Sequence, residues 1–359
     1  MESMKIGRKT LSGFCARVFG SLGVSDEDAR LAAEVLVAAD ARDIPSHGTA
    51  RLWRYTAGLR NGLMKAAENE VAVKETPVSL LVDARGALGA PASVRTMRRV
   101  IEKADATGMA FACVRDSNHY GIAGYYAMMA LEHDMIGLSM TNTAALGVPT
   151  FARQVMFGTN PLAFAAPAGR EKPFVLDMST TVVTRGKIEV YDRAGKPLPP
   201  GWAVDKDGLS ASDAKSLLRD MLSREGGGIV PLGGDSEEFG GHKGYGLAVM
   251  VDILTGVMAS SAFGEEVRDT EVSSARVSHC FAAMRIDLFR EAAEFRRDMD
   301  AMLLALRTAP KAAGADRVYY AGLKESEAEE RTEREGISLS EGAVAALRRT
   351  GQDCGVDFP

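Results

Sequence analysis

Short apolar segments alternate with helix-forming segments through the middle of this chain, and that alternation limits the fold more than any other feature. The segments with the composition of strands span residues 78–82, 109–114, 136–140, 162–166 and 173–176. Between them, one helix is expected from Pro91, which a first helical turn tolerates, to about Ala106, and another over residues 125–132. Strands that alternate with helices in this way are typical of an α/β or α+β domain.

Both ends of the chain are expected to be helical instead. Ser25 and Asp28 have the spacing of a capping box, and apolar residues at helical spacing follow them from Leu31 to Ala39. A helix over residues 49–61, closed by Gly62, is expected next, and further helices over residues 245–258, 289–306 and 340–349. A chain of 359 residues is long for one domain, so two domains are expected.

The composition argues against several classes of function. The net charge is −5 and no stripe of Lys and Arg stands apart from acidic residues, which disfavours a nucleic-acid partner. The four cysteines are far apart, with no CxxC or Cys/His spacing, so neither a metal site nor a disulfide framework is expected. The longest apolar runs fall far short of the ~20 residues that span a bilayer, and the N-terminus lacks the apolar core of a signal peptide. A cytoplasmic protein without a membrane partner is therefore expected.

The first of two polar islands runs from Pro45 to Arg51 and contains one of only five histidines. Ser46 is a suitable N-cap for the helix that carries Arg51, and His47 and Arg51, four residues apart, would share a face of that helix. A guanidinium can hold a carboxylate through two hydrogen bonds while the imidazole exchanges a proton with the neighbouring oxygen. The pattern indicates a site for a small anionic substrate. The alternative is that His47 only packs and Arg51 forms a surface ion pair.

The second island, Ser117-Asn118-His119-Tyr120-Gly121, follows the apolar strand that is expected to end at Val114. Side chains at the end of an internal strand often face a ligand crevice. Gly121 and Gly124 would allow backbone amides to approach a phosphate or a substrate. The alternative is a plain turn from strand to helix, with His119 in a structural hydrogen bond. His133 and His279 stand apart and are expected to be structural or surface residues.

Other loops carry groups that can bind a substrate or a cofactor. Small hydroxyl and amide side chains lie at strand edges in Thr141-Asn142-Thr143, Gly158-Thr159-Asn160-Pro161 and Asp177-Met178-Ser179-Thr180. They can hydrogen-bond a ribose, an amide or a carboxylate, although each segment taken singly is more typical of a turn.

The segment from Gly240 to Gly246 combines glycines with His242 and Lys243 ahead of a helix, which indicates an anion site at a helix N-terminus. It lacks the spacing of a P-loop. A Rossmann GxGxxG occurs nowhere in the chain, so an enzyme that uses a dinucleotide would need another fold.

Together these segments resemble the type-2 malate/L-lactate dehydrogenase family of NAD(P)-dependent oxidoreductases. That family also includes ureidoglycolate, sulfolactate and diketogulonate dehydrogenases and a cyclic ketimine reductase. The resemblance covers nearly the whole chain. Six motifs carry it in the family's order: Ser46-His47-Gly48 with Arg51, residues 118–126, residues 158–161, residues 176–180 with 185–188, residues 201–205 and residues 241–246. Each motif alone is weak evidence, whereas six in order are specific.

The resemblance implies a mixed α/β fold that is not a Rossmann fold and that assembles as a homodimer. A helical domain of residues 1–75, completed by C-terminal helices over about residues 310–359, would accompany an α/β domain of residues 76–309 that binds the cofactor and the substrate. Such a fold agrees with the absent glycine fingerprint.

The resemblance also implies roles for individual residues. His47 matches the proton donor and acceptor, supported by Ser46, with His119 as the alternative acid/base. Arg51 matches a carboxylate anchor, and Thr159 matches a position that contacts the substrate. The positions that match cofactor contacts are His119, Tyr120, Gly121, Ile122, Thr141, Asn142, Asp177, Met178, Ser179, His242, Lys243 and Gly322.

Two positions bear on the reaction. Members usually carry Pro-Gly-Glu in the last loop that contacts the cofactor, whereas this chain has Ala321-Gly322-Leu323 and keeps only the glycine. Lys187 stands where ketimine reductases carry an acidic residue, which favours a 2-hydroxy acid. The expected reaction is hydride transfer between NAD or NADP and a small 2-hydroxy/2-oxo acid of the malate or lactate type, without a metal. The alternatives are an NADPH-dependent cyclic ketimine reductase and a non-catalytic ligand-binding protein of the same fold.

Overall fold

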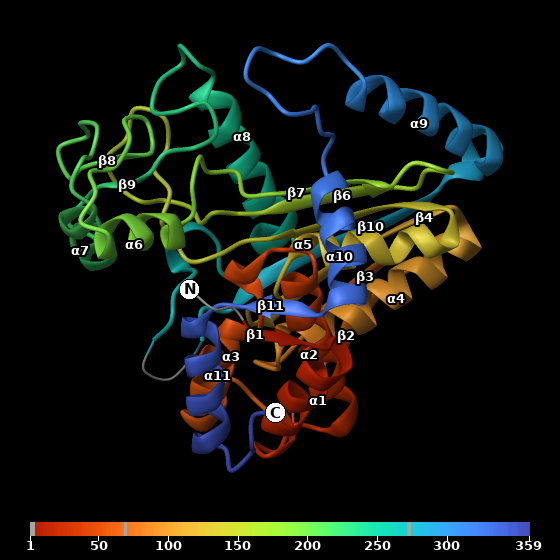
Figure 1. Cartoon of the computed structure of the whole chain (residues 1–359), viewed down its shortest axis with the longest axis horizontal. Helices are drawn as coiled ribbons and strands as arrows, with labels where there is room; N and C mark the ends of the chain where they lie inside the picture. Colours follow the sequence, from red (N-terminus) through yellow and green to blue (C-terminus); the bar gives the residue numbers. More distant parts are fainter. Residues whose placement is uncertain (1–3, 68–69, 271–273) are drawn as a thin grey trace.

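The centre of the molecule is a seven-stranded mixed sheet with the strand order β2-β3-β4-β10-β5-β6-β7 (Figure 1). The computed structural model describes residues 4–67, 70–270 and 274–359. β3 and β4 are parallel, and the other neighbouring pairs of this sheet are antiparallel. The strands are Val71–Glu75 (β2), Ser79–Asp83 (β3), Met109–Ser117 (β4), Met135–Thr141 (β5), Leu162–Ala166 (β6), Phe174–Met178 (β7) and Val277–Arg285 (β10).

Helices pack on both faces of this sheet, which explains why its strands are largely apolar. α4 (Gly89–Thr107) connects β3 to the parallel β4, and Met97 and Ile101 of α4 share one buried cluster with Ala112 and Val114 of β4. α5 (Ala123–Met129) packs beside α4 on the same face. On the other face lies α9 (Ala292–Arg307), whose Leu303 packs near Ile136 and Phe164. The mixed α/β fold predicted from the sequence is therefore confirmed.

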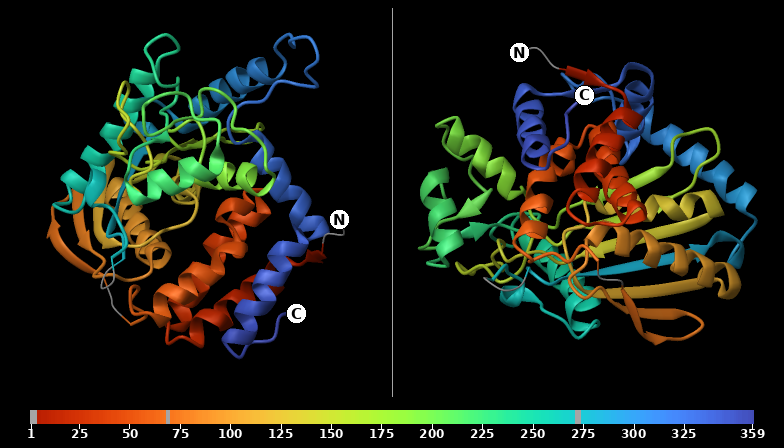
Figure 2. Two further views of the ribbon diagram at one scale, coloured as in Figure 1. Left: turned by 90° about the vertical axis from the view of Figure 1, so that its left-hand side faces the viewer. Right: turned by 90° about the horizontal axis from the view of Figure 1, so that it is seen from below.

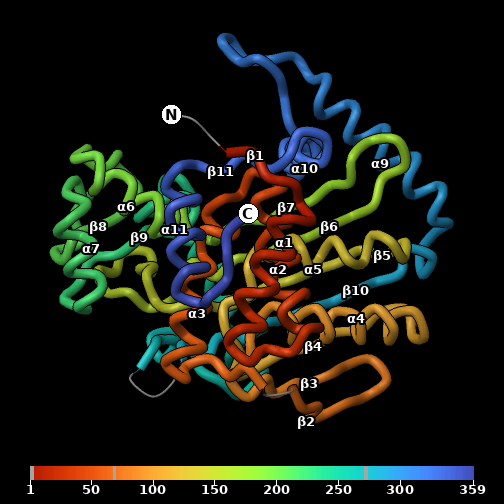
Figure 3. The backbone as a smooth tube through the Cα atoms, turned by 60° about the horizontal axis from the view of Figure 1, so that its bottom comes forward, coloured from red at the N-terminus to blue at the C-terminus, as the bar shows by residue number. Residues whose placement is uncertain are grey.

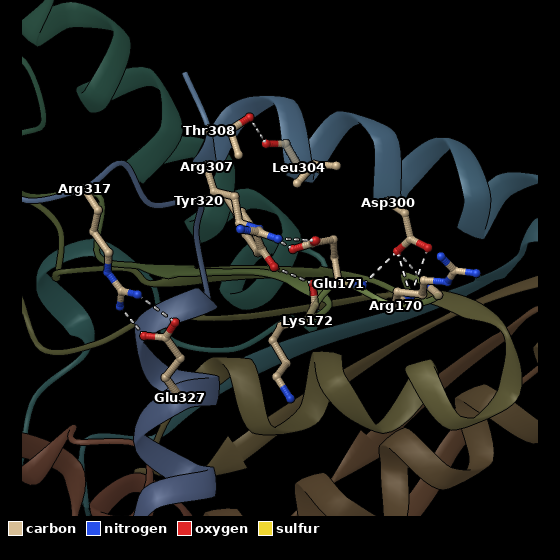
Figure 4. A network of polar contacts seen from close by, with 11 residues as sticks. Arg170, Glu171, Lys172, Asp300, Leu304, Arg307, Thr308, Arg317, Tyr320 and Glu327 are labelled. Atoms are coloured by element: carbon tan, nitrogen blue, oxygen red, sulfur yellow. Dashed lines mark hydrogen bonds and ion pairs between the residues drawn. The ribbon is translucent and has the colours of Figure 1, made fainter. Parts of the chain in front are cut away.

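Polar contacts fasten α9 to the turn between β6 and β7 (Figure 4). The Asp300 carboxylate accepts hydrogen bonds from the backbone N–H groups of Gly169, Arg170 and Glu171 at 2.9 to 3.0 Å. These hydrogen bonds lower the pKa of Asp300. Arg307, two turns further along α9, pairs with the Glu171 carboxylate at 2.8 Å. The helix is thus held by contacts along its length rather than by apolar packing alone.

Both ends of the chain join in one helical unit beside the sheet (Figures 2 and 3). β1 (Met4–Ile6) pairs with β11 (Ile337–Leu339), and one buried cluster includes Phe14, Leu36, Leu52 and Leu347. The helices are α1 (Arg8–Gly20), α2 (Asp26–Ala41), α3 (Leu52–Arg60), α10 (Leu323–Glu335) and α11 (Glu341–Asp353). The division at residues 75 and 310 stays a prediction, and the pairing of β2 with β3 favours a boundary ahead of Val71.

The capping box at the start of α2 is only half formed. Ser25 Oγ accepts a hydrogen bond from the Asp28 N–H at 3.2 Å, as predicted. The Asp28 carboxylate does not reach back, because it forms an ion pair with Arg95 of α4.

Some elements were not expected from the sequence. A small lobe at the left of Figure 1 contains α6 (Arg185–Arg193), α7 (Ala214–Ser223), β8 (Ala203–Val204) and β9 (Gly228–Ile229) around its own buried cluster. α8 (Gly241–Asp252) begins inside the Gly-His-Lys segment, ahead of the predicted start at Tyr245, and continues into a π-helical turn, η4 (Ile253–Val257). None of the described helices is long and apolar enough to cross a membrane.

Candidate active site

The first polar island folds as two short turns between α2 and α3. η1 (Pro45–His47) and η2 (Thr49–Arg51) are 3₁₀ turns on either side of Gly48, whose backbone is extended at ψ −163°. The prediction that His47 and Arg51 share a helix face is therefore wrong, because α3 begins only at Leu52. The prediction that Ser46 caps this helix is wrong for the same reason, since Ser46 lies inside η1 and caps nothing.

Asp40, near the end of α2, holds the two turns in place. Its buried carboxylate accepts hydrogen bonds from the Thr49 backbone N–H at 2.8 Å and from the Thr49 hydroxyl at 2.6 Å. A Cβ added to Gly48 would lie 1.8 Å from Asp40 Oδ1, so only glycine fits there. Burial raises the pKa of Asp40 to about 6, and the hydrogen bonds from Thr49 oppose that rise. Sequence reasoning missed this residue, although an acid within the apolar stretch of α2 was an available signal.

The two islands place their histidines face to face. The ring centroids of His47 and His119 are 5.5 Å apart, with 20° between the ring planes. Ser46 Oγ lies 2.9 Å from His47 Nδ1, and Tyr55 Oη lies 2.6 Å from His119 Nδ1. The backbone N–H of Gly121 also donates to His119 Nδ1, at 3.3 Å. Because an amide N–H can only donate, Nδ1 is the acceptor, and the proton of the neutral His119 ring is on Nε2.

The surroundings keep both imidazoles neutral at pH 7. Burial lowers the pKa of His47 to about 4, and the positive charge of Arg51 adds to this effect. Burial also lowers the pKa of His119 well below its usual value, with further lowering by His47, Arg54 and Arg51. A bound anion would offset the charge of Arg51 and make protonation of His47 easier.

Arg51 has a free hydrogen-bonding edge beside this histidine pair. Its Nε donates to the Ser46 carbonyl oxygen at 2.7 Å, which fixes the direction of the side chain. Within the described part of the chain, no carboxylate forms an ion pair with its terminal amino groups. Burial and the neighbouring charges of Arg54 and Arg185 lower the pKa of Arg51. A half-buried guanidinium in this position can accommodate a carboxylate.

A cavity of about 320 Å³ is lined by three of the predicted cofactor contacts, Ile122, Asp177 and Gly322. Ile44 of the same lining leads directly into η1, and Ile122 follows the second island. Asp177, an exposed residue near the end of β7, lines the cavity, and its carboxylate accepts a hydrogen bond from the Gly124 N–H at 2.7 Å.

Gly322 ends the cavity at the start of α10. Glycine is required here for two reasons. The backbone has a φ of +88°, and an added Cβ would lie only 2.8 Å from Val175. α10 therefore begins at the cavity, which Lys324 and Glu325 of its first turn also line, and a helix N-terminus suits an anion such as a phosphate.

Three predicted cofactor residues have side chains committed to the protein interior. Thr141 Oγ1 donates to the Ser278 carbonyl oxygen at 3.0 Å, and both polar atoms of the Asn142 side chain have partners in the protein. The ring of Tyr120 is 1% exposed and stacks on His279 at 4.4 Å. The structure therefore does not support cofactor contacts by these three side chains. The prediction that His279 stands apart from the islands is wrong, because its ring lies against Tyr120; it is fully buried, and its two ring nitrogens contact the hydroxyls of Thr141 and Ser117.

The remaining predicted residues make contacts of their own or are exposed. Thr159 is half-buried, and its N–H donates to Thr143 Oγ1 at 2.9 Å. Met178 ends β7, and Ser179 Oγ donates to the Thr181 carbonyl oxygen at 2.9 Å. His242 and Lys243 are exposed in the first turn of α8. No group of three or more potential metal ligands occurs in residues 4–67, 70–270 or 274–359.

Comparisons with known proteins agree with this fold. A sequence profile described as malate/L-lactate dehydrogenase matches residues 6–348. The malate dehydrogenase of Pyrococcus horikoshii is 38% identical over 354 residues, which cover 99% of this chain and 96% of that protein. The malate/(S)-sulfolactate dehydrogenase of Methanothermus fervidus is 35% identical over 344 residues, with 95% and 96% covered.

Relatives with other activities and a solved structure extend the comparison. A Δ¹-pyrroline-2-carboxylate/Δ¹-piperideine-2-carboxylate reductase of Pseudomonas putida is 31% identical over 256 residues, 71% of each chain. The crystal structure of malate dehydrogenase from Entamoeba histolytica superposes with a TM-score of 0.95 at 30% identity and covers 100% of both chains. Profile, relatives and fold agree over nearly the whole length, and the chain belongs to the malate/L-lactate dehydrogenase family.

Proposed function

We propose that this protein catalyses reversible hydride transfer between a nicotinamide dinucleotide and a small 2-hydroxy/2-oxo acid. The observation that carries this proposal is the pair of stacked, neutral histidines beside Arg51, whose terminal amino groups form no ion pair with a carboxylate in the part of the chain that the structure describes. A 2-oxo acid carries both groups that such a site can bind. Its carboxylate can pair with the guanidinium, and its carbonyl oxygen can exchange a proton with the imidazole.

The residues present can hold such a cofactor. The cavity lined by Ile122 and Gly322 offers the Asp177 carboxylate, which can accept hydrogen bonds from ribose hydroxyls, and Lys324 with the start of α10, which can face phosphates. Its volume of about 320 Å³ is at the lower end of ligand pockets. When bound, the nicotinamide supplies or accepts the hydride.

In the mechanism we propose, Arg51 orients the acid and His47 handles the proton. The terminal amino groups of Arg51 bind the 1-carboxylate bidentately. His47 donates a proton to the carbonyl oxygen during reduction and accepts it from the hydroxyl during oxidation. Ser46 Oγ, at His47 Nδ1, keeps the ring oriented. The Nε2–H of His119 donates a hydrogen bond toward the same oxygen, and His119 is the alternative acid/base.

An assay of cofactor oxidation across 2-oxo acids, with NADH and with NADPH, tests this function. We expect turnover with at least one 2-oxo acid and a change of nicotinamide fluorescence on mixing. The relative from Pseudomonas putida makes cyclic ketimine reduction the second candidate. Turnover of a cyclic ketimine, without turnover of oxaloacetate or pyruvate, would replace the proposal by that activity. Absence of any cofactor binding would indicate a non-catalytic protein of the same fold.

We propose further that the protein is a homodimer whose partner covers exposed apolar side chains on β4 and η4. Met109 and Phe111 are 40% and 43% exposed, and Ile253 and Val257 are each 49% exposed. η4 lies beside β4, because Cys113 Sγ donates to the Leu254 carbonyl oxygen at 3.4 Å. Light scattering should give about twice the chain mass of 38.3 kDa, and Phe111→Lys should reduce it to that of one chain. A wild-type mass of one chain would contradict the dimer.

The cytoplasmic location stays a prediction.

A further inference from the structure

His279 is a fully buried residue near the start of β10 that has no part in the proposed reaction. Its Nε2 lies 2.9 Å from the Ser117 hydroxyl at the end of β4, and its Nδ1 lies 2.8 Å from the Thr141 hydroxyl at the end of β5. Burial lowers the pKa of His279 to about 3, so the ring is neutral at pH 7. A neutral imidazole has one donor and one acceptor nitrogen, and a hydroxyl can serve as either partner, so both contacts are hydrogen bonds.

The same ring supports Tyr120. The ring centroids of His279 and Tyr120 are 4.4 Å apart with 2° between the planes, and Tyr120 also stacks on Tyr126 at 4.7 Å. The Tyr126 hydroxyl donates a hydrogen bond to the Tyr120 carbonyl oxygen, which holds the backbone of the turn as well. Ser117 and Tyr120 flank His119 in the sequence. His279 therefore holds the turn on both sides of His119.

The contacts of His119 itself are made through Nδ1, which accepts hydrogen bonds from the Tyr55 hydroxyl and the Gly121 N–H at 2.6 and 3.3 Å. These two contacts orient the ring, whereas the position of its Nε2–H group also depends on where the backbone of the turn lies. Displacement of a catalytic group by about 1 Å can cost about 10²-fold in rate. A residue that fixes this backbone therefore influences turnover.

We propose that His279 is a positioning residue for His119, which keeps the Nε2–H group of His119 directed toward the reacting oxygen. This inference rests on the proposed function, in which that group donates a hydrogen bond to the oxygen. His279 is 0% exposed, so it acts through the turn rather than on the substrate.

Two amide variants of His279 remove one hydrogen bond each. Asparagine places its amide near the position of Nδ1 and can keep the contact with Thr141, whereas glutamine reaches the position of Nε2 and can keep the contact with Ser117. His279→Asn should lower kcat for a 2-oxo acid by about 10- to 100-fold, and His279→Gln should lower it by less than about tenfold. KM for the acid should change less than about threefold, because Arg51 holds its carboxylate from another segment.

Two further variants separate positioning from a loss of stability. Ser117→Ala removes the hydrogen bond to Nε2 with a smaller change in volume, and it should lower kcat by about tenfold. It tests the inference even where His279→Asn does not fold. Leu303→Ala is the control, because Leu303 is a 0% exposed residue of α9 that packs in a separate cluster. It should lower the unfolding temperature and leave kcat unchanged.

A double-mutant cycle shows whether His279 acts through His119. His119→Asn keeps a measurable rate in the proposed mechanism, because His47 still transfers the proton. The group to be positioned is absent in that background, so adding His279→Asn should change kcat less than about twofold. A residue with a merely structural role would lower kcat by the same factor in both backgrounds, and that result would overturn the assignment.

The ring signal of His119 provides a readout that does not need turnover. The chain has five histidines, so NMR spectra of protein with ¹³C-labelled histidine can be assigned by replacing each histidine in turn. Ser117→Ala should shift the signal of His119 and leave those of His133 and His242 unchanged, and Leu303→Ala should shift none of the three. An unshifted His119 signal in Ser117→Ala would overturn the assignment.

The two proposals fail in different ways. A shifted His119 signal in a protein that turns over no 2-oxo acid would refute the proposed reaction and leave the link from His279 to His119 intact. Turnover of 2-oxo acids that both His279→Asn and Ser117→Ala leave unchanged would confirm the reaction and refute the positioning role.

Discussion

Replacing His47 with asparagine is expected to lower turnover by about 10²–10⁴-fold, the usual contribution of a positioned acid/base. Asparagine keeps a polar group near Ser46 but cannot exchange the proton. The cavity that we assign to the cofactor is lined by other residues, among them Ile122 and Asp177, so cofactor affinity should be largely retained. Steady-state rates in both directions and a fluorescence titration with NADH and NADPH measure the two effects separately.

The pH dependence of the wild type follows from the lowered pKa of His47, about 4 in the free protein. Oxidation of a hydroxy acid needs the neutral imidazole, which is present above this pKa and lost as the pH falls through it. Reduction needs the protonated ring, so its kcat/KM should fall about tenfold per pH unit as the pH rises above the pKa.

Full activity of His47→Asn together with an inactive His119→Asn would assign the proton transfer to His119 instead.

Replacing Gly48 with alanine is expected to have the second-largest effect. The added Cβ would lie 1.8 Å from Asp40 Oδ1, so the turn between His47 and Thr49 has to move. Displacement of a catalytic group by about 1 Å can cost about 10²-fold in rate. Overpacking of a buried site costs about 1–3 kcal/mol of folding free energy. Measurements of kcat/KM and of thermal unfolding should show both losses.

Two further variants separate the contact with Asp40 from a general effect of alanine. Gly342 lies in α11, and a Cβ added there would meet no atom within 4 Å. Gly342→Ala should therefore leave the activity unchanged and raise the free energy of unfolding by about 0.5–1 kcal/mol. Asp40→Ala combined with Gly48→Ala removes the clash, so the second substitution should cost less stability in that background. A fully active and stable Gly48→Ala protein would show that this contact does not position His47.

Several elements were predictable because their patterns are local. β6 occupies the residues expected for it, and α4 contains Pro91 in its first turn as expected. β10 escaped prediction, because Ser278, His279, Cys280 and its alanines lack the β-branched or aromatic run that marks a strand. It forms a strand because its backbone N–H and C=O groups hydrogen-bond to β4 on one side and to β5 on the other. Tyr55 was missed at the site because it is recognisable only by its contact with His119, whereas Asp40 had a signal in the sequence as an acid within an apolar helix.

The sequence by itself determined strands β3 to β7 of the central sheet, the two histidine islands and the family, all of which depend on residues close together in the chain. Only the tertiary structure decided that His47 and His119 stack, that Arg51 keeps a free edge, and that Thr141 and Asn142 turn inward. The physical reason is that periodicity and turn chemistry are properties of neighbouring residues. Burial, ring stacking and the pKa of a histidine depend instead on distant segments that packing brings together.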